Sequence, residues 1–288
     1  MTDDPRWPRA AAWLSAGALP CDLAVLGVPA HRTSISPTGA NATPAAIRAA
    51  LARYSTYAWS TGIDIASVLA HDAGDVEQPD GPDGEQATSD RVAGLAAAAR
   101  LVIALGGDNS ITFAVARGAW RGHESQAGLI TVDAHHDLRD GVSNGSPVRR
   151  LVEAGLPGRR IVQIGIADFA NSAEYAARAR DLGIHVLTRD LLHRRPIPDL
   201  WGEAIDIAGG AGGPIHVDLD VDVCDRSVVP ACPASAPGGI SADELRAFAR
   251  LAGRTRQVTS LDITEIDATA DTADQRTVRL GALLVLEA

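Results

Sequence analysis

The stretch LITVDAHHD, residues 129–137, joins an uncharged run to a cluster of acids and histidines. Leu129–Val132 is rich in branched apolar side chains and predicts a strand, and nearly continuous apolar strands are typical of parallel sheets covered on both faces. Similar runs recur at 23–26, 101–105, 161–164, 185–187, 215–219 and 258–263. The chain therefore carries at least seven strand candidates.

Stretches rich in Ala and Arg separate these runs and predict helices near 44–54, 89–99, 110–119, 147–154, 172–182, 242–251 and 274–286. Strands that alternate with helices predict an α/β fold, with a mostly parallel sheet between two layers of helices. The polar residues 78–88 are expected to form a surface loop, and 208–214 a flexible connector. Neither divides the chain, so we expect one three-layer α/β/α domain over residues 1–288.

Composition narrows the function classes. Among 288 residues, 46% are hydrophobic, which is enough for a continuous core. The net charge of −10 argues against a nucleic-acid surface. No run of 18 apolar residues and no charged-then-apolar leader is present, so we expect a cytoplasmic protein that neither crosses a membrane nor is secreted. Cys21, Cys224 and Cys232 form no CxxC pair and are expected to be free thiols.

The acidic cluster 133–137 follows directly on a predicted buried strand. Ligand sites in open α/β sheets gather beyond the carboxyl ends of strands. Carboxylates and imidazoles this close together repel or desolvate one another unless a cation neutralises them. DAHHD therefore predicts a metal site.

Two further strand ends carry carboxylates. In HVDLDVD, residues 216–222, strand alternation places His216, Asp218, Asp220 and Asp222 on one face, with no arginine in the run. In Ser260–Asp267 alternation pairs Asp262 with Thr264 and leaves Glu265 at the strand end, a weak signal by itself.

Oxygen and nitrogen donors without a sulfur pair favour Mn²⁺ over a structural zinc site. Carboxylates from separate strands suit two ions that share a bridging water, which is chemistry for hydrolysis.

These motifs resemble those of the ureohydrolase family, which includes arginase, agmatinase and formimidoylglutamase. The family pattern is GGDHS, DAHxD and S-x-D-x-D-x-x-D-P, followed by Pro-Ala and later Gly-Gly. Here the chain reads GGDNS at 106–110, DAHHD at 133–137 and DLDVDVCDR at 218–226, then Pro-Ala at 230–231 and Gly-Gly at 238–239. GVP at 27–29, PAAIR at 44–48 and HDAGD at 71–75 extend the resemblance over most of the chain.

The third motif can be aligned in two registers. With His216 in the place of the family's serine, Asp218 and Asp220 would be the metal ligands. With Asp218 in that place, the ligands would be Asp220 and Asp222, and Asp225 and the later pairs fall at the family's spacing without a gap. We prefer the second register.

The resemblance implies two Mn²⁺ ions per chain, held by Asn109, Asp133, His135, Asp137, Asp220 and Asp222. Asp133 and Asp220 would bridge the ions, and Asp137 and Glu265 would act in catalysis, with Glu265 engaging the amidine head of the substrate. Asn109 stands where the family has a histidine ligand. Either its amide oxygen binds, or His136 or water replaces the lost ligand, or only one ion binds tightly; we expect one weak Mn²⁺ site.

The segment NGSPVR, residues 144–149, suggests the substrate. Arginases and agmatinases carry a histidine here, whereas this segment and GIADFANS at 165–172 resemble formimidoylglutamases. Arg149 is a candidate for binding a substrate carboxylate, because a guanidinium offers a bidentate fork, although it could equally be a helix-surface residue. The remaining candidates for substrate contact are His136, Asn144 and Glu265.

The resemblance thus implies hydrolysis of N-formimino-L-glutamate to L-glutamate and formamide by a hydroxide bridging two Mn²⁺ ions. A guanidino-compound hydrolase releasing urea is the first alternative. A non-catalytic binding protein with an impaired metal site is the second. We also expect a small-molecule substrate, no nucleic-acid or membrane partner, and a homo-oligomer.

Overall fold

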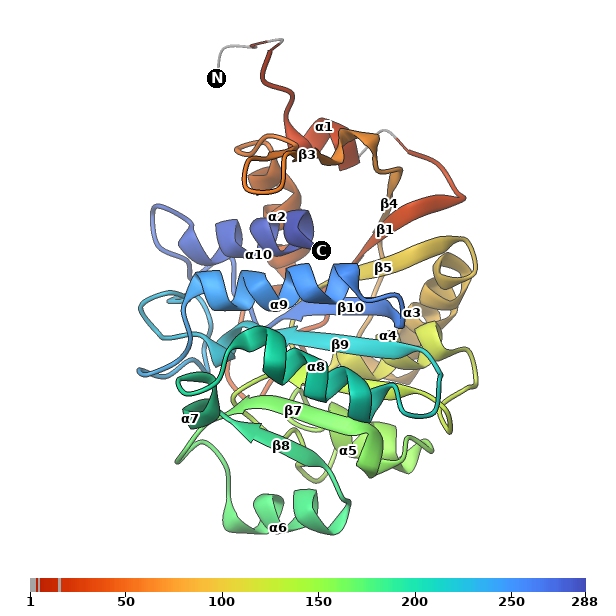
Figure 1. Cartoon of the computed structure of the whole chain (residues 1–288), viewed down its shortest axis with the longest axis vertical. Coiled ribbons are helices and arrows are strands. Elements are labelled where there is room, and N and C mark those ends of the chain that lie inside the picture. Colours follow the sequence, from red (N-terminus) through yellow and green to blue (C-terminus); the bar gives the residue numbers. More distant parts are fainter. Residues whose placement is uncertain (1–3, 5, 15–16) are drawn as a thin grey trace.

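The computed structural model describes residues 4, 6–14 and 17–288. Its centre is a sheet in the order β4-β1-β5-β10-β9-β6-β7-β8, with every neighbouring pair parallel (Figure 1). The strands are β1 (Cys21–Val28), β4 (Ala70–Asp75), β5 (Ala99–Gly106), β6 (Gly128–Val132), β7 (Ile161–Ile166), β8 (His185–Thr188), β9 (Ile215–Asp220) and β10 (Val258–Thr264). A small antiparallel hairpin joins β2 (Tyr57–Ala58) to β3 (Ile63–Asp64).

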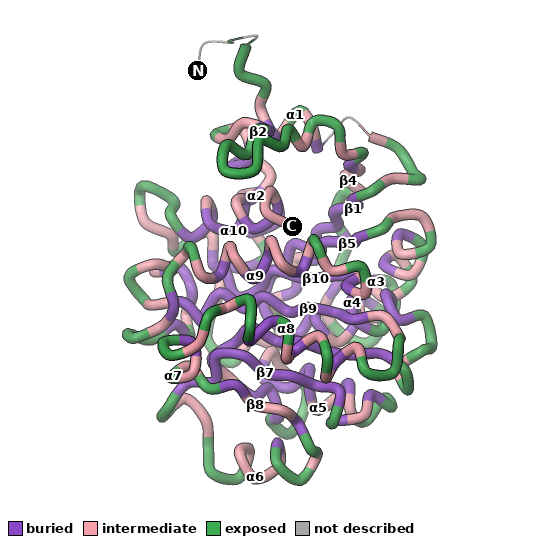
Figure 2. Tube along the Cα trace, in the orientation of Figure 1, coloured by how far each residue is buried: buried purple, intermediate pink, exposed green. Residues whose placement is uncertain are grey.

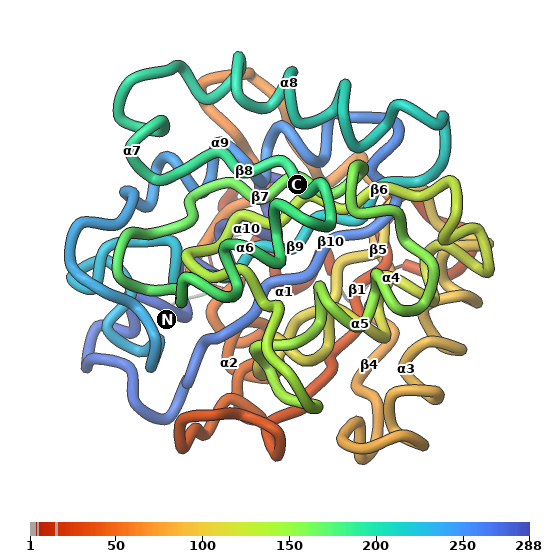
Figure 3. Tube along the Cα trace, turned by 90° about the horizontal axis from the view of Figure 1, so that it is seen from below, coloured from red at the N-terminus to blue at the C-terminus, as the bar shows by residue number. Residues whose placement is uncertain are grey.

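Helices cover both faces of the sheet. They are α1 (Ala10–Leu14), α2 (Thr43–Leu51), α3 (Gly81–Ala96), α4 (Ile111–Trp120), α5 (Pro147–Glu153), α6 (Ala173–Asp181), α7 (Arg189–Leu192), α8 (Ile197–Ala208), α9 (Ala242–Arg254) and α10 (Arg276–Glu287). Single 3₁₀ turns occur at η1 (Ala40–Ala42), η2 (Ile65–Ser67), η3 (Gly158–Arg160) and η4 (Val221–Val223). Figure 3 shows α8 and α5 on opposite sides of the central strands.

Alternation along the strands explains the two faces. On β5, Ile103 and Leu105 join the core beneath α2, α8, α9 and α10, whereas Val102 and Ala104 join the core beneath α3 and α4. The central strands are therefore buried along most of their length (Figure 2). Apolar runs without alternation predicted this arrangement, and the three-layer α/β/α fold is confirmed.

All seven predicted strands are present. The prediction missed β4, whose sequence AHDAGD is polar because it forms an edge of the sheet and is only partly buried. It also missed α8, which ends at Ala208, so the connector predicted at 208–214 begins one residue later, at Gly209.

The predicted loop at 78–88 is wrong, because α3 begins at Gly81. Its buried positions Gly84, Thr88, Val92 and Leu95 recur at helical spacing. A side chain at Gly84 would come within 2.3 Å of the Gln78 carbonyl oxygen, so the glycine serves close packing rather than a loop. No described helix is long and apolar enough to cross a membrane.

Candidate metal centre and substrate pocket

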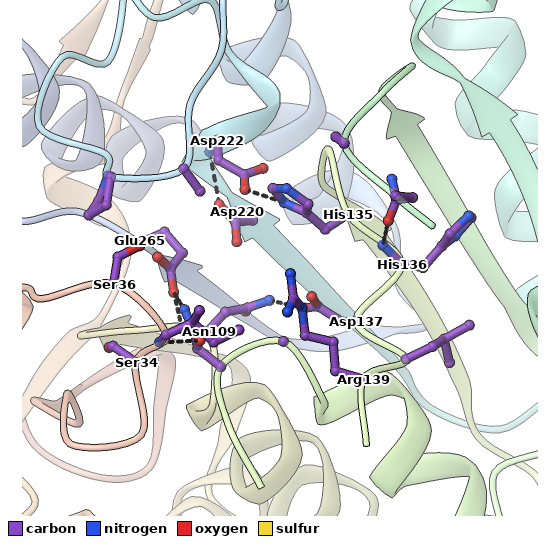
Figure 4. Close-up of a pocket in the computed structure, with 18 of the residues that line it drawn as sticks. Ser34, Ser36, Asn109, His135, His136, Asp137, Arg139, Asp220, Asp222 and Glu265 are labelled. Carbon is purple, nitrogen blue, oxygen red and sulfur yellow. Dashed lines mark hydrogen bonds and ion pairs between the residues drawn. The ribbon is translucent and has the colours of Figure 1, made fainter. Parts of the chain in front are cut away.

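The sheet order brings together four strand ends that are distant in sequence. β5, β10, β9 and β6 are consecutive neighbours, and parallel strands end at the same edge. Residues 106–110, 264–265, 220–222 and 133–137 therefore converge there. A pocket of about 320 Å³, shown in Figure 4, is lined on one side by residues from these four strand ends: Asn109, His135, His136, Asp137, Asp220, Asp222 and Glu265.

The GGDNS turn is shaped by close backbone approach. A Cβ atom at Gly107 would lie 1.8 Å from the Ala30 carbonyl oxygen, so no other residue fits without displacement. The Gly107 N–H donates to the Val28 carbonyl, and the Glu265 N–H donates to the Gly107 carbonyl at 3.0 Å. These contacts hold the end of β5 against the ends of β1 and β10. They place Asn109 beside Glu265.

Two triads of potential metal ligands share one aspartate. Asp133, His135 and Asp222 offer ligand atoms that all lie within 4.8 Å of one another, and so do Asp133, Asp137 and Asp218. Asp133 is buried, and its Oδ2 atom has no hydrogen-bond partner among the described residues. A buried carboxylate oxygen without a donor is costly unless a cation occupies the space before it. The oxygen-rich donor set with one imidazole fits Mn²⁺.

The charges of this cluster do not balance without a cation. Burial, and then repulsion by Asp222, raises the pKa of Asp133 to about 7. Burial by itself would lower the pKa of His135, but Asp222, whose Oδ2 lies 2.6 Å from His135 Nδ1, and Asp133 outweigh it and raise that pKa to about 11. Burial and neighbouring carboxylates also raise the pKa values of Asp137 and Asp220 well above the usual range.

Asp222 reaches the cluster by a turn. The expectation that it continues the strand face of His216, Asp218 and Asp220 is wrong, because β9 ends at Asp220 and η4 follows. The Asp220 carboxylate accepts a hydrogen bond from the Asp222 N–H at 2.8 Å and so caps this turn. The turn aims Asp222 at His135, while Asp220 lines the pocket.

Asn109 and Glu265 are tied to each other and to the pocket wall. Asn109 Nδ2 donates to Asp137 Oδ2, and Asn109 Oδ1 accepts from Thr112 Oγ1 at 2.8 Å. Glu265 Oε1 accepts from the Asn109 N–H and from Asn144 Nδ2, each at 2.8 Å. Burial raises the pKa of Glu265 to about 7 although the Asn144 hydrogen bond opposes the shift.

Asp137 and Glu265 also share a strained backbone. Their φ angles are 52° and 64°, in the left-handed region that residues other than glycine seldom adopt. Such strain often accompanies functional positions, where the surrounding structure fixes the direction of a side chain.

His136 is held by the neighbouring strand. Its Nδ1 lies 2.7 Å from Gln163 Oε1, and its backbone N–H donates to Asn171 Oδ1. Burial lowers the pKa of its side chain, so the imidazole is neutral at physiological pH. These contacts make His136 a wall of the pocket, on the side formed by β7.

Arg149 braces the loop that precedes α5. Its Nε donates to the Arg139 carbonyl at 2.7 Å, its Nη2 donates to the Gly141 carbonyl, and its Nη1 pairs with Glu153. It does not belong to the described pocket lining.

Arg139 is the one arginine in the described lining of the pocket, and our sequence prediction missed it. Its guanidinium makes no hydrogen bond or ion pair with the residues that the structure describes. Its side chain lies on Gly145, where a Cβ atom would come 2.7 Å from Arg139 Cδ. The available signal was an arginine two residues beyond DAHHD, at the rim of the predicted site.

Comparison with known proteins assigns this architecture to a class. A family model described as "Arginase family" matches residues 21–288, so the chain belongs to the arginase family of hydrolases, as the motifs predicted.

Within that family the chain is similar to formimidoylglutamases. It is 32% identical to that of Bacillus subtilis (strain 168), covering 92% of this chain and 85% of the relative, and 34% identical to that of Halalkalibacterium halodurans, covering 91% and 84%. The crystal structure of the B. subtilis formimidoylglutamase superposes with a TM-score of 0.92 at 30% identity, covering 100% of this chain and 92% of that one. A Trypanosoma cruzi formiminoglutamase with Mn²⁺ gives 0.90 at 25% identity, covering 98% and 97%.

Proposed function

We propose that this protein hydrolyses N-formimino-L-glutamate to L-glutamate and formamide with the help of Mn²⁺. The observation that carries the proposal is the polarity of the pocket. Carboxylates and the buried Glu265 gather at one side, and the unpaired guanidinium of Arg139 lies at the rim. A substrate with a cationic amidine head and a carboxylate tail matches both ends. Similarity to formimidoylglutamases supports the same substrate.

We assign the metal to the side chains at the strand ends. Asp133 would bridge two ions, since it belongs to both triads, and Asp220 would bridge them from β9. His135 and Asp222 would be the further ligands of one ion, and Asp137 would be a ligand of the other. When bound there, Mn²⁺ would supply an acidified water for attack on the carbon of the C=N group. A structure of the related T. cruzi enzyme contains Mn²⁺.

Glu265 is oriented to bind the amidine head. Asn109 and Asn144 fix its Oε1 atom, while Oε2 accepts no hydrogen bond from a described residue and is free to receive an N–H of the substrate. Asn109 contacts both Glu265 and Asp137, and Asp137, which also lines the pocket, would accept the proton of the attacking water. These are the two side chains that we propose touch the reacting atoms.

Asn144 favours this activity over its main alternative, that of a guanidino-compound hydrolase. Its Nδ2 donates to Glu265 and its Oδ1 accepts from the Ile35 N–H at 3.0 Å, so both ends of the amide hold the loop in place. A neutral amide engaged in this way cannot transfer a proton as a histidine would. The terminal ammonium of agmatine would also approach Arg139, a like charge.

The test is a substrate screen of the Mn²⁺-loaded protein. N-formimino-L-glutamate, agmatine, 4-guanidinobutyrate and arginine are compared, and formamide and urea are both measured. We expect formamide from the first compound and at least about a 100-fold lower kcat/KM for the others, well within the roughly 10⁴- to 10⁵-fold discrimination that unpaired polar groups can produce. Urea release would support the guanidino alternative. No product from a protein with bound Mn²⁺ would support the non-catalytic one.

Two wider features of the proposal follow from the family resemblance. We propose that the chain assembles as a homo-oligomer, which light scattering of the purified protein measures. We also propose that it acts in the cytoplasm, which fractionation of the source cells measures.

A further inference from the structure

Asp218 occupies an unusual position beside the proposed metal centre. Its carboxylate lies within 4.8 Å of ligand oxygens from Asp133 and Asp137. It is fully buried, and its Oδ2 atom has no hydrogen-bond partner among the described residues. Asp133 Oδ2 is likewise buried and has no hydrogen-bond partner among the described residues. Two unpartnered, buried carboxylate oxygens in one cluster mark a place for a cation.

The neighbouring strands provide no positively charged side chain that contacts Asp218. Strand register pairs it with Asp262 on β10 and with Thr131 on β6. The imidazole of His216 contacts Asp262 Oδ2 at 3.1 Å and Ser260 Oγ at 2.8 Å rather than Asp218. Thr264 Oγ1 donates to Asp218 Oδ1 at the long distance of 3.4 Å, and the Asp218 carboxyl also faces the carboxyl of Asp262, which brings no positive charge.

An ion bound on that side of the site would also lack one of the ligands of the family pattern. Asp137 belongs to the same triad as Asp218, and the family's histidine ligand beside it is replaced here by Asn109. Both ends of the Asn109 amide are engaged, the nitrogen by Asp137 and the oxygen by Thr112. The family motif carries serine in the place of Asp218. In the register that we prefer, this chain therefore has an amide at position 109 where the family pattern has an imidazole, and a carboxylate at position 218 where it has a hydroxyl.

We infer that Asp218 is a direct ligand of the Mn²⁺ ion that Asp137 serves, and that it substitutes for the imidazole absent at position 109. The inference rests on the proposed Mn²⁺ site but not on the identity of the substrate. A carboxylate is a hard oxygen donor that Mn²⁺ accepts readily. The exchange of a neutral imidazole for a carboxylate keeps the ligand number and adds one negative charge to the site.

The test compares four forms of the full chain: wild type, Asp218→Ser, Asn109→His and the double variant. Isothermal titration calorimetry and electron paramagnetic resonance measure Mn²⁺ stoichiometry and affinity without any substrate. We expect the wild type to bind two ions. Asp218→Ser should weaken one of them by at least about tenfold. The double variant should recover the lost affinity, because the new imidazole supplies the missing donor.

Asp225→Asn is the matched control. Asp225 belongs to the same segment, and its carboxylate accepts hydrogen bonds from Ser227 and the Gly238 N–H outside both triads. This variant should bind both ions as the wild type does.

Thermal unfolding separates a ligand role from a structural one. Asp218→Ser and the shape-preserving Asp218→Asn each remove a buried carboxylate that lacks a positive partner. Both metal-free variants should therefore unfold at no lower temperature than the metal-free wild type, yet gain less stability from Mn²⁺. A structural role predicts a lower unfolding temperature and an unchanged Mn²⁺ effect.

Unchanged Mn²⁺ affinity and stoichiometry in both Asp218 variants would overturn the inference, and so would failure of Asn109→His to restore binding. Absence of formamide release from a wild type with two bound ions would overturn the proposed function and leave the role of Asp218 intact.

Discussion

Replacement of Arg139 by leucine should weaken the binding of substrates that carry a carboxylate while leaving the fold intact. A hydrogen bond to a charged partner contributes about 1.5–3 kcal/mol, and the exposed Arg139 side chain competes with water, so the lower part of that range applies. This corresponds to a loss of roughly 10- to 30-fold in kcat/KM for N-formimino-L-glutamate. Because Arg139 has no partner among the described residues, the free energy of unfolding should change by less than about 0.5 kcal/mol.

Steady-state kinetics with two substrates measures this effect. We expect the loss to appear as a higher KM, with kcat changed only slightly, because the carboxylate contact is the same in the ground state and the transition state. Activity toward agmatine, which has no carboxylate, should not fall.

Arg149→Leu is the comparison variant. It removes the contacts to the Arg139 and Gly141 carbonyls and the ion pair with Glu153, so it should lower the unfolding temperature. If Arg139→Leu leaves KM unchanged and Arg149→Leu raises it without a loss of stability, the carboxylate site belongs to Arg149 and our reasoning is refuted.

Three further predictions concern the metal centre and its support. Glu265→Gln keeps an acceptor for the Asn109 N–H but removes the negative charge that faces the amidine. Its kcat/KM should therefore fall by about 100-fold while Mn²⁺ binding is retained. A kcat/KM equal to that of the wild type would exclude the contact between Glu265 and the amidine. Mn²⁺ binding at pH 7 should release at least about one proton, because His135 with a pKa of about 11 and Asp133 at about 7 must both lose protons to act as ligands. Affinity should accordingly fall as the pH is lowered from 8 to 6, and calorimetry in buffers of different ionisation enthalpy counts the protons; a pH-independent affinity contradicts this. Gly107→Ala would drive a methyl group into the Ala30 carbonyl and should lower the free energy of unfolding by about 3 kcal/mol, measured in urea; an unchanged urea midpoint would contradict this.

The sequence determined the local elements and the kind of chemistry. Uncharged, branched runs such as Leu129–Val132 favoured buried strands, which placed the acids directly after them at strand ends. The motifs at 106–110, 133–137 and 218–226 identified the family without any coordinates. The prediction failed at β4 and at the start of α3, where the sequence is polar. An edge strand and a closely packed helix both tolerate residues that are typical of loops.

Only the tertiary structure decided which side chains meet. Alternation placed Asp222 on the face of β9, but the turn capped by Asp220 delivers it to His135. The sequence suggested Arg149 for the substrate carboxylate, but Arg149 binds the loop carbonyls, and Arg139, ten residues earlier, lines the pocket.

The sequence offered Asp218 as a metal ligand only in the register that we did not prefer, and the tertiary structure brings its carboxylate within ligand distance of Asp133 and Asp137. Spacing along a chain reports which residues follow a strand. Strand order, register and the path of each turn fix which atoms lie within ligand distance, and these depend on packing between segments that are far apart in the sequence.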